Sequence, residues 1–148
     1  MYRIAPVLYF AYGSNMSRAR LESRVGPVEV IGPGQLCGYR HAFSKLGRDG
    51  TGKGNVHLHP GDTVYGALYR INARRVVDLD RIEGGYRRTE VDVEVYSERI
   101  AAFTYVALRT EHGLVPGDDY LAHYRDGIRE HGITLAYWSR ILRAARCP

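Results

Sequence analysis

The sequence predicts an α+β fold in which a mostly antiparallel β-sheet is accompanied by peripheral helices. Strand-like segments dominate before Leu108 and helical patterns dominate after it. Between Thr89 and Tyr96, valines alternate with acidic residues, which is typical of an antiparallel strand with one face buried and one face in water. The chain has 148 residues without a repeat, a linker or a low-complexity segment, so we expect one domain spanning residues 1–148.

Five segments of the first half are expected to be extended. The apolar run at 7–11 predicts a buried strand, and Gly26-Pro27 ends a short helix predicted at 17–24. The glycine-rich stretch 47–54 predicts a flexible loop. The remaining strands are expected at 28–31, 35–44, 55–59 and 63–71, with interruptions at Gly32-Pro33-Gly34 and Pro60-Gly61-Asp62.

The second half is expected to begin with a helix capped by Asn72. Its apolar residues recur at helical spacing over 73–82, and Gly84-Gly85 stops it. A hairpin of strands 89–96 and 100–108 follows, with Val91, Val93 and Val95 facing inward. Helices are predicted at 119–130 and 134–145.

The charge of the chain is compatible with an anionic small molecule as partner. The formal net charge is +5, and nineteen of the twenty-one basic residues are arginine. These arginines are scattered and form no basic tail, which argues against nucleic-acid binding. No apolar run reaches the length of a membrane span, and no signal-peptide pattern is present, so we expect a soluble cytoplasmic protein without a membrane partner.

The potential metal ligands do not form a recognisable site. Cys37 and Cys147 lack zinc spacing, and Cys37 is expected to be a small buried thiol. His57 and His59 alternate on a strand without a third ligand at suitable spacing. We therefore expect no metal and no cofactor.

A strand-like run ends in the pentapeptide Tyr12-Gly13-Ser14-Asn15-Met16. Gly13 permits a close ligand approach that a Cβ would block, and Ser14 and Asn15 are both good helix N-caps. A strand end, a glycine turn and a helix start together direct several backbone N–H groups one way, which suits a carboxylate or a developing oxyanion. An ordinary capped turn would use the same residue types.

A second block follows about seventy residues later and reads Leu79-Asp80-Arg81-Ile82-Glu83-Gly84-Gly85-Tyr86-Arg87-Arg88. Together the two blocks resemble the gamma-glutamylcyclotransferase family, which includes the AIG2-like proteins. In that family a helix ends in an acidic residue followed by glycine, and an alternating strand comes next. The resemblance extends from about Val7 to Tyr120.

The resemblance implies a small closed β-barrel and a cyclisation reaction. The α-amine of a γ-glutamyl amide attacks its own γ-carbonyl, which releases 5-oxoproline and a free amine or amino acid. Glu83 would be the general acid/base, and its position at a helix C-terminus, where a negative charge opposes the helix dipole, also favours a functional role. The substrate-binding residues would be Tyr12, Gly13, Ser14, Asn15, Met16 and Tyr120.

Several alternatives remain open from the sequence. The same barrel could be a non-catalytic module that binds an anionic metabolite, although such a module has no use for a carboxylate at Glu83. An RNA-binding barrel would need exposed aromatic rings beside clustered arginines. Asp80 and Glu83 could form a carboxylate pair of the glycosidase type. The leaving group and the oligomeric state are not determined by the sequence.

Overall fold

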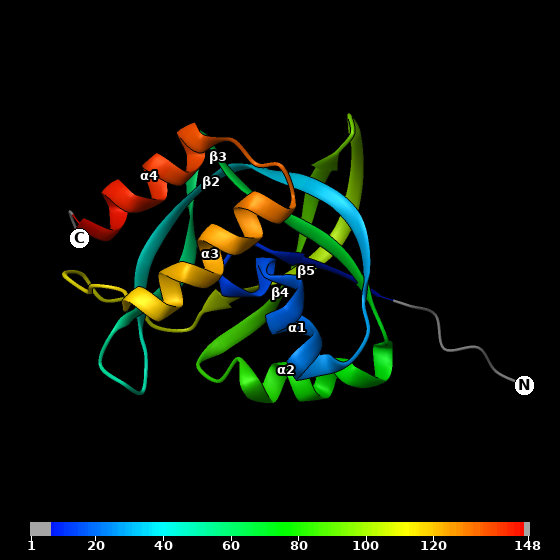
Figure 1. Cartoon of the computed structure of the whole chain (residues 1–148), viewed down its shortest axis with the longest axis horizontal. Coiled ribbons are helices and arrows are strands. Elements are labelled where there is room, and N and C mark those ends of the chain that lie inside the picture. The colour runs from blue at the N-terminus through cyan, green and yellow to red at the C-terminus, as the bar shows by residue number, and fades with distance from the viewer. Residues whose placement is uncertain (1–6, 147–148) are drawn as a thin grey trace, which may run out of the picture.

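The computed structural model describes residues 7–146, and in it five strands close into a barrel (Figure 1). β1 pairs antiparallel with β3 and parallel with β5, where Tyr9 lies opposite Phe103, and this second pairing closes the barrel. The predicted α+β fold with a small, mostly antiparallel barrel is confirmed. Around the barrel the order of strands is β1 (Val7–Ala11), β3 (Gly52–Ile71), β2 (Glu29–Leu46), β4 (Tyr86–Val95) and β5 (Glu98–Ala107).

The helices lie outside the barrel. Figure 1 shows α1 and α3 crossing the front of the barrel, α2 below it and α4 at the upper left. A short 3-10 helix, η1, connects β1 to α1, and a Cβ on Gly127 of α3 would overlap with Met16 of η1. This close approach packs η1 between α3 and the barrel. The helical segments are η1 (Ser14–Met16), α1 (Arg18–Val25), η2 (Ala73–Arg75), α2 (Val76–Ile82), α3 (Asp118–Glu130) and α4 (Leu135–Arg146).

The two predicted interruptions of strands are not chain reversals. β2 continues through Gly32-Pro33-Gly34 with only a register shift between Val30 and Gly32. The glycines serve close packing instead, because a Cβ on Gly34 would lie 3.2 Å from the Phe10 ring. β3 likewise continues through Pro60-Gly61-Asp62, although Tyr39 pairs with Leu58 and Cys37 with Thr63, so residues 59–62 leave the ladder as a bulge.

Other boundaries differ by a few residues. Gly52, Lys53 and Gly54 belong to β3 rather than to the predicted loop, because Gly52 and Lys53 pair with the end of β2. Ser17 caps α1 by accepting a hydrogen bond from the Arg20 N–H, and Asn72 caps the 3-10 helix before α2 as predicted. Cys37 was expected to be buried but is exposed.

The core consists of two clusters of apolar side chains. One lies between the barrel and the helices and includes Met16, Tyr69 and Tyr124. The other fills the barrel near β4, where Val91, Val93 and Val95 are buried as predicted. Among the helices formed by residues 7–146, none has the length and apolar character needed to cross a membrane.

Candidate active site

The two sequence blocks meet at a small cavity between the end of β1, the end of α2 and the start of α3. Its volume is about 30 Å³. The structure brings six of the seven predicted site residues to this cavity, and Met16 is the exception. The lining residues are Tyr9, Tyr12, Gly13, Ser14, Asn15, Gly54, Glu83, Tyr86, Tyr105 and Tyr120.

Glu83 is the acidic residue of this cavity. It follows the last residue of α2, and its N–H donates to the Leu79 carbonyl at 2.8 Å. Gly85, with a φ of 87°, then turns the chain into β4. The Glu83 side chain is 17% exposed, so this helix end presents a carboxylate to the cavity rather than to bulk water.

One oxygen of Glu83 is held by two donors. Its Oε1 accepts a hydrogen bond of 2.9 Å from Asn15 Nδ2 and a longer one of 3.4 Å from Arg24 Nη1. Burial raises the pKa of Glu83 above its ordinary value, whereas the charge of Arg24 and the Asn15 hydrogen bond act in the opposite direction. The net shift is upward, which makes the carboxylate a stronger base than an exposed glutamate.

Asn15 joins the two sequence blocks. Its side-chain amide donates to Glu83 and to the Tyr9 hydroxyl, the latter at 3.1 Å, and its Oδ1 accepts from Arg24 at 3.3 Å. Asn15 is only 3% exposed, so its polar atoms depend on these partners. Asn15, which the sequence predicted as a substrate contact, holds one carboxylate oxygen of Glu83 in the structure.

Met16 and Tyr12 play different parts in the loop. The Met16 side chain is fully buried in the core, away from the cavity lining, and its N–H donates to the Gly13 carbonyl at 3.0 Å. The Tyr12 side chain lines the cavity, but its hydroxyl donates to the Tyr105 carbonyl at 2.6 Å. Met16 therefore anchors the loop in the core. The part of Tyr12 that lines the cavity is mainly its ring, because its hydroxyl is bonded to Tyr105.

Gly54 organises two tyrosines on the opposite side of the cavity. Its N–H donates to the Tyr120 hydroxyl at 2.9 Å, and its carbonyl accepts from the Tyr86 hydroxyl at 2.7 Å. Because the Tyr120 oxygen accepts this bond, its own proton is available for another acceptor. A Cβ on Gly54 would overlap with the Tyr124 hydroxyl, so only glycine fits this position without displacement.

Sequence reasoning missed several of these residues. Tyr86 lies within the second block and Tyr9 in the strand-like run that leads into the first, and these positions were a signal that could have identified both residues. No comparable sequence signal identified Gly54, because it lies in a stretch whose composition is typical of an ordinary glycine-rich loop. Its contacts depend on α3, which comes more than sixty residues later.

Other predicted clusters do not form a site. Asp80 does not line the cavity, because its carboxylate accepts from the Tyr105 hydroxyl at 2.6 Å and pairs with Arg88 at 3.2 Å. The alternative of an Asp80–Glu83 catalytic pair thus loses its support. Within residues 7–146, no three His, Cys, Asp or Glu side chains are grouped so as to hold a metal ion.

A larger pocket of about 180 Å³ lies beside the cavity. We call the two spaces the inner cavity and the outer pocket. They share Ser14, Glu83, Tyr86 and Tyr120, so they are neighbouring parts of one site. The outer pocket is lined in addition by Arg20, Arg24, Lys45, Gly47, Arg48, Lys53, Ile82 and Gly84.

A closed barrel with a buried carboxylate facing a glycine loop defines an enzyme-like site, and comparison with known proteins identifies its class. Residues 9–122 match the family model "Gamma-glutamyl cyclotransferase, AIG2-like". The chain therefore belongs to this family, and the predicted enzyme type is confirmed at the level of the family.

Individual relatives agree with this assignment. A putative gamma-glutamylcyclotransferase of Bacillus subtilis, YkqA, is 32% identical over 78% of this chain, which spans only 44% of that relative's length. Bovine gamma-glutamylcyclotransferase is 26% identical, with 90% of this chain and 76% of the relative covered. A solved gamma-glutamyl cyclotransferase structure superposes with a TM-score of 0.86 and 25% identity, covering 97% of this chain and 89% of that one.

Proposed function

We propose that this chain converts a γ-glutamyl amide into 5-oxoproline and a free amine or amino acid, with Glu83 as the general acid/base. The observation that supports this most strongly is the buried Glu83 carboxylate, which faces a cavity bounded by the Gly13–Asn15 backbone. The reaction is intramolecular, so holding the substrate in a folded conformation supplies a large part of the rate. The cytoplasmic location expected from the sequence belongs to this proposal.

Glu83 acts on protons at two points. The substrate α-amine is an ammonium at neutral pH and transfers a proton to the carboxylate before its lone pair attacks the γ-carbonyl. When the C–N bond of the tetrahedral intermediate breaks, Glu83 returns the proton to the departing nitrogen. The ring nitrogen then loses its second proton to become the lactam N–H, and the released amine takes up that proton as it becomes an ammonium. We assign the proton transfers of Glu83 to Oε2, because Oε1 is already engaged by Asn15 and Arg24.

The loop stabilises the charge that develops on the γ-carbonyl oxygen. The Met16 N–H is used by the Gly13 carbonyl, so the N–H groups of Gly13, Ser14 and Asn15 are the proposed donors to the oxyanion or to the substrate α-carboxylate. The Tyr120 hydroxyl, whose oxygen accepts from Gly54, is a further proposed donor to substrate.

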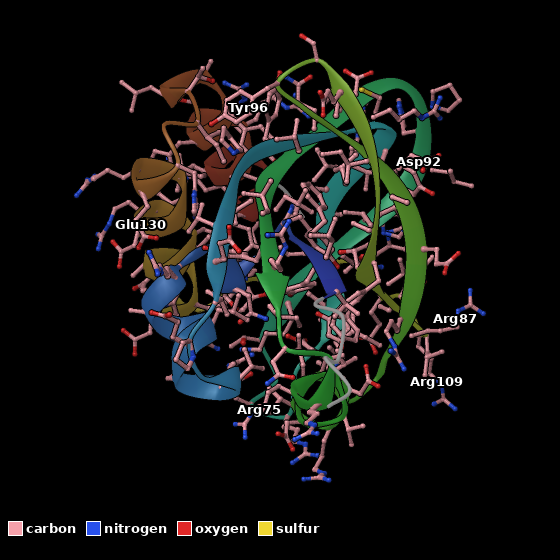
Figure 2. The ribbon with its side chains drawn as sticks, turned by 90° about the vertical axis from the view of Figure 1, so that its right-hand side faces the viewer. Arg75, Arg87, Asp92, Tyr96, Arg109 and Glu130 are labelled. Atoms are coloured by element: carbon pink, nitrogen blue, oxygen red, sulfur yellow. The ribbon has the colours of Figure 1, made fainter. Side chains whose placement is uncertain are left out.

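The alternative functions fit these residues less well. A module that only binds an anion gains nothing from a buried carboxylate beside the ligand, because like charges repel. An RNA-binding surface needs exposed aromatic rings, and within residues 7–146 the exposed large apolar side chains include one ring, that of Tyr96. In Figure 2, Tyr96 lies near the top of the molecule, whereas Arg75, Arg87 and Arg109 extend outward nearer its lower end, so this ring does not lie beside the labelled arginines.

The test is release of 5-oxoproline from glutathione, γ-glutamyl amino acids and γ-glutamyl amines. Wild type is compared with Glu83→Gln and with Asp78→Asn, a matched change of an acid on the same helix α2. Loss of a general base lowers turnover by about 10²- to 10⁴-fold, so Glu83→Gln should be nearly inactive while Asp78→Asn stays active. Full activity in Glu83→Gln would refute the assigned base, and no release from any compound would favour the binding module.

A further inference from the structure

The outer pocket has a charge that the cyclisation chemistry does not require. Five of its lining side chains are cationic, namely Arg20, Arg24, Lys45, Arg48 and Lys53, whereas Glu83 is its one acidic lining residue in the described part of the chain. Arg24 is paired with Glu83 at 3.4 Å, which leaves four cations without that partner. A pocket of this composition attracts an anion and repels a cation.

The two lysines of the chain are both placed at this pocket. Lys45 of β2 and Lys53 of β3 are directly opposite each other in the antiparallel ladder. Like charges at opposite positions of a sheet lower its stability, so this arrangement disfavours folding unless something anionic lies between the ammonium groups. Asp49 pairs with Lys53 at 3.3 Å, but its side chain is 59% exposed and lies outside the pocket lining.

Each ammonium group also lies over a ring of the inner cavity. Lys45 Nζ is 5.1 Å from the centre of the Tyr86 ring, and Lys53 Nζ is 4.6 Å from that of Tyr120. Gly85 leaves room for the Lys45 stem, because a Cβ there would lie 2.8 Å from Lys45 Cε. The lysines are thus positioned at the boundary between the inner cavity and the outer pocket.

The position of the two spaces decides which part of a substrate reaches the lysines. In the proposed reaction the glutamyl group folds onto itself at the inner cavity, between Glu83 and the Gly13–Asn15 backbone. The outer pocket is larger, at about 180 Å³, and begins at the same carboxylate. The group that leaves from the γ-carbonyl would therefore extend into the outer pocket.

We infer that the outer pocket selects γ-glutamyl amides whose leaving group is an amino acid with carboxylates, through Lys45 and Lys53, and that it disfavours leaving amines that are cationic. This inference rests on the proposed cyclisation and adds its substrate class. Arg48 is an exposed residue in the lining of the outer pocket, and it extends the positive electrostatic potential of this pocket toward solvent. The lysines act in recognition and take no part in proton transfer.

The experiment compares kcat/KM for four substrates that differ only in the leaving group: γ-glutamyl-aspartate, γ-glutamyl-alanine, γ-glutamyl-ethylamide and γ-glutamyl-putrescine. We expect kcat/KM to fall in that order. In the double variant Lys45→Gln/Lys53→Gln, the preference for aspartate over ethylamide should shrink by about tenfold. Arg129→Gln, which removes an exposed charge of α3 away from the pocket, should leave this preference unchanged.

Two results would overturn the inference while the cyclisation stands: equal kcat/KM for the aspartate and putrescine compounds, or an unchanged preference in the double variant. If no compound releases 5-oxoproline, the proposed reaction fails, and calorimetric titration of the same four compounds tests the pocket alone. Tighter binding of the aspartate compound that is lost in the double variant would then support anion selection, and equal binding of all four would refute it.

Discussion

Asn15 and Glu83 are separated by 68 positions in the chain, yet Asn15 Nδ2 donates a 2.9 Å hydrogen bond to Glu83 Oε1. This bond connects the turn after the first strand to the end of α2. It fixes one carboxylate oxygen and leaves the other for the proposed proton transfer. The distance between the loop and the proposed base is therefore set by a side chain of the loop itself.

Replacing Asn15 with alanine should lower kcat/KM by about 10- to 100-fold, because a buried hydrogen bond to a charged group contributes on the order of 1.5–3 kcal/mol. Steady-state release of 5-oxoproline measures this effect. Asn72→Ala is the matched control, since Asn72 caps a helix outside the site. Equal losses in the two variants would show a general effect on folding rather than positioning of Glu83.

The pH dependence of kcat/KM should reveal the raised pKa of Glu83. The base must be deprotonated, so activity should be lost as the pH falls through a value above the ordinary 4.5. Arg24 lowers the pKa of Glu83 by its charge, and Arg24→Met should move this acidic limb to still higher pH. Arg18→Met is the control, because Arg18 lies on the same helix α1 but is more exposed. An acidic limb at the same pH in both variants would contradict the charge coupling between Arg24 and Glu83.

Glu83→Gln should stabilise the fold at neutral pH. A carboxyl group whose pKa is higher in the folded than in the unfolded state lowers the stability of the fold as the pH rises above the unfolded pKa of 4.5. Below pH 4.5 this destabilisation disappears, because the group becomes protonated in both states. The melting temperature of Glu83→Gln should therefore exceed that of wild type at pH 7 and approach it near pH 4. Calorimetric melting across this range measures the difference, and a variant less stable than wild type at pH 7 would contradict the assigned direction.

Gly54→Ala should destabilise the protein by about 1–3 kcal/mol, because the added methyl group overlaps with the Tyr124 hydroxyl. Tyr124→Phe removes the overlapping atom, although it also removes the 2.7 Å contact with His41. The double variant should consequently lose less stability than the sum of the single losses. Chemical denaturation measures all three variants.

Gly84→Ala serves as the control for this cycle. A Cβ on Gly84 comes no closer than 3.7 Å to the nearest atom, the Arg81 carbonyl oxygen, so little change in stability is expected. Strict additivity of the Gly54 and Tyr124 effects would show that the hydroxyl is not the obstacle.

Local sequence patterns predicted a large part of this fold. The alternating valines of β4 are buried and the cap at Asn72 forms as expected, because side-chain periodicity and capping depend on near neighbours. The continuous strands β2 and β3 were not predicted. Their glycines and prolines resemble turn signals, but the barrel uses Gly34 for close packing and residues 59–62 as a bulge.

The candidate site was predicted only in part. Two sequence blocks indicated Glu83 and the loop at residues 12–16, and six of the seven proposed residues line the inner cavity. Met16 does not, because α3 covers it at Gly127. Gly54 was not anticipated, since its hydrogen bonds to Tyr86 and Tyr120 join strands and a helix that are distant in the chain.

The sequence by itself determined most of the strand and helix pattern, the family and the residue types available for chemistry, because these depend on short segments. Only the tertiary structure decided which groups meet. Closure of the barrel by β1 and β5 brings Asn15, Arg24 and Glu83 together and removes the carboxylate from water, which raises its pKa. The same folding places Lys45 opposite Lys53 at the outer pocket. Desolvation and charge coupling act through space, so neither can be obtained from neighbours in the chain.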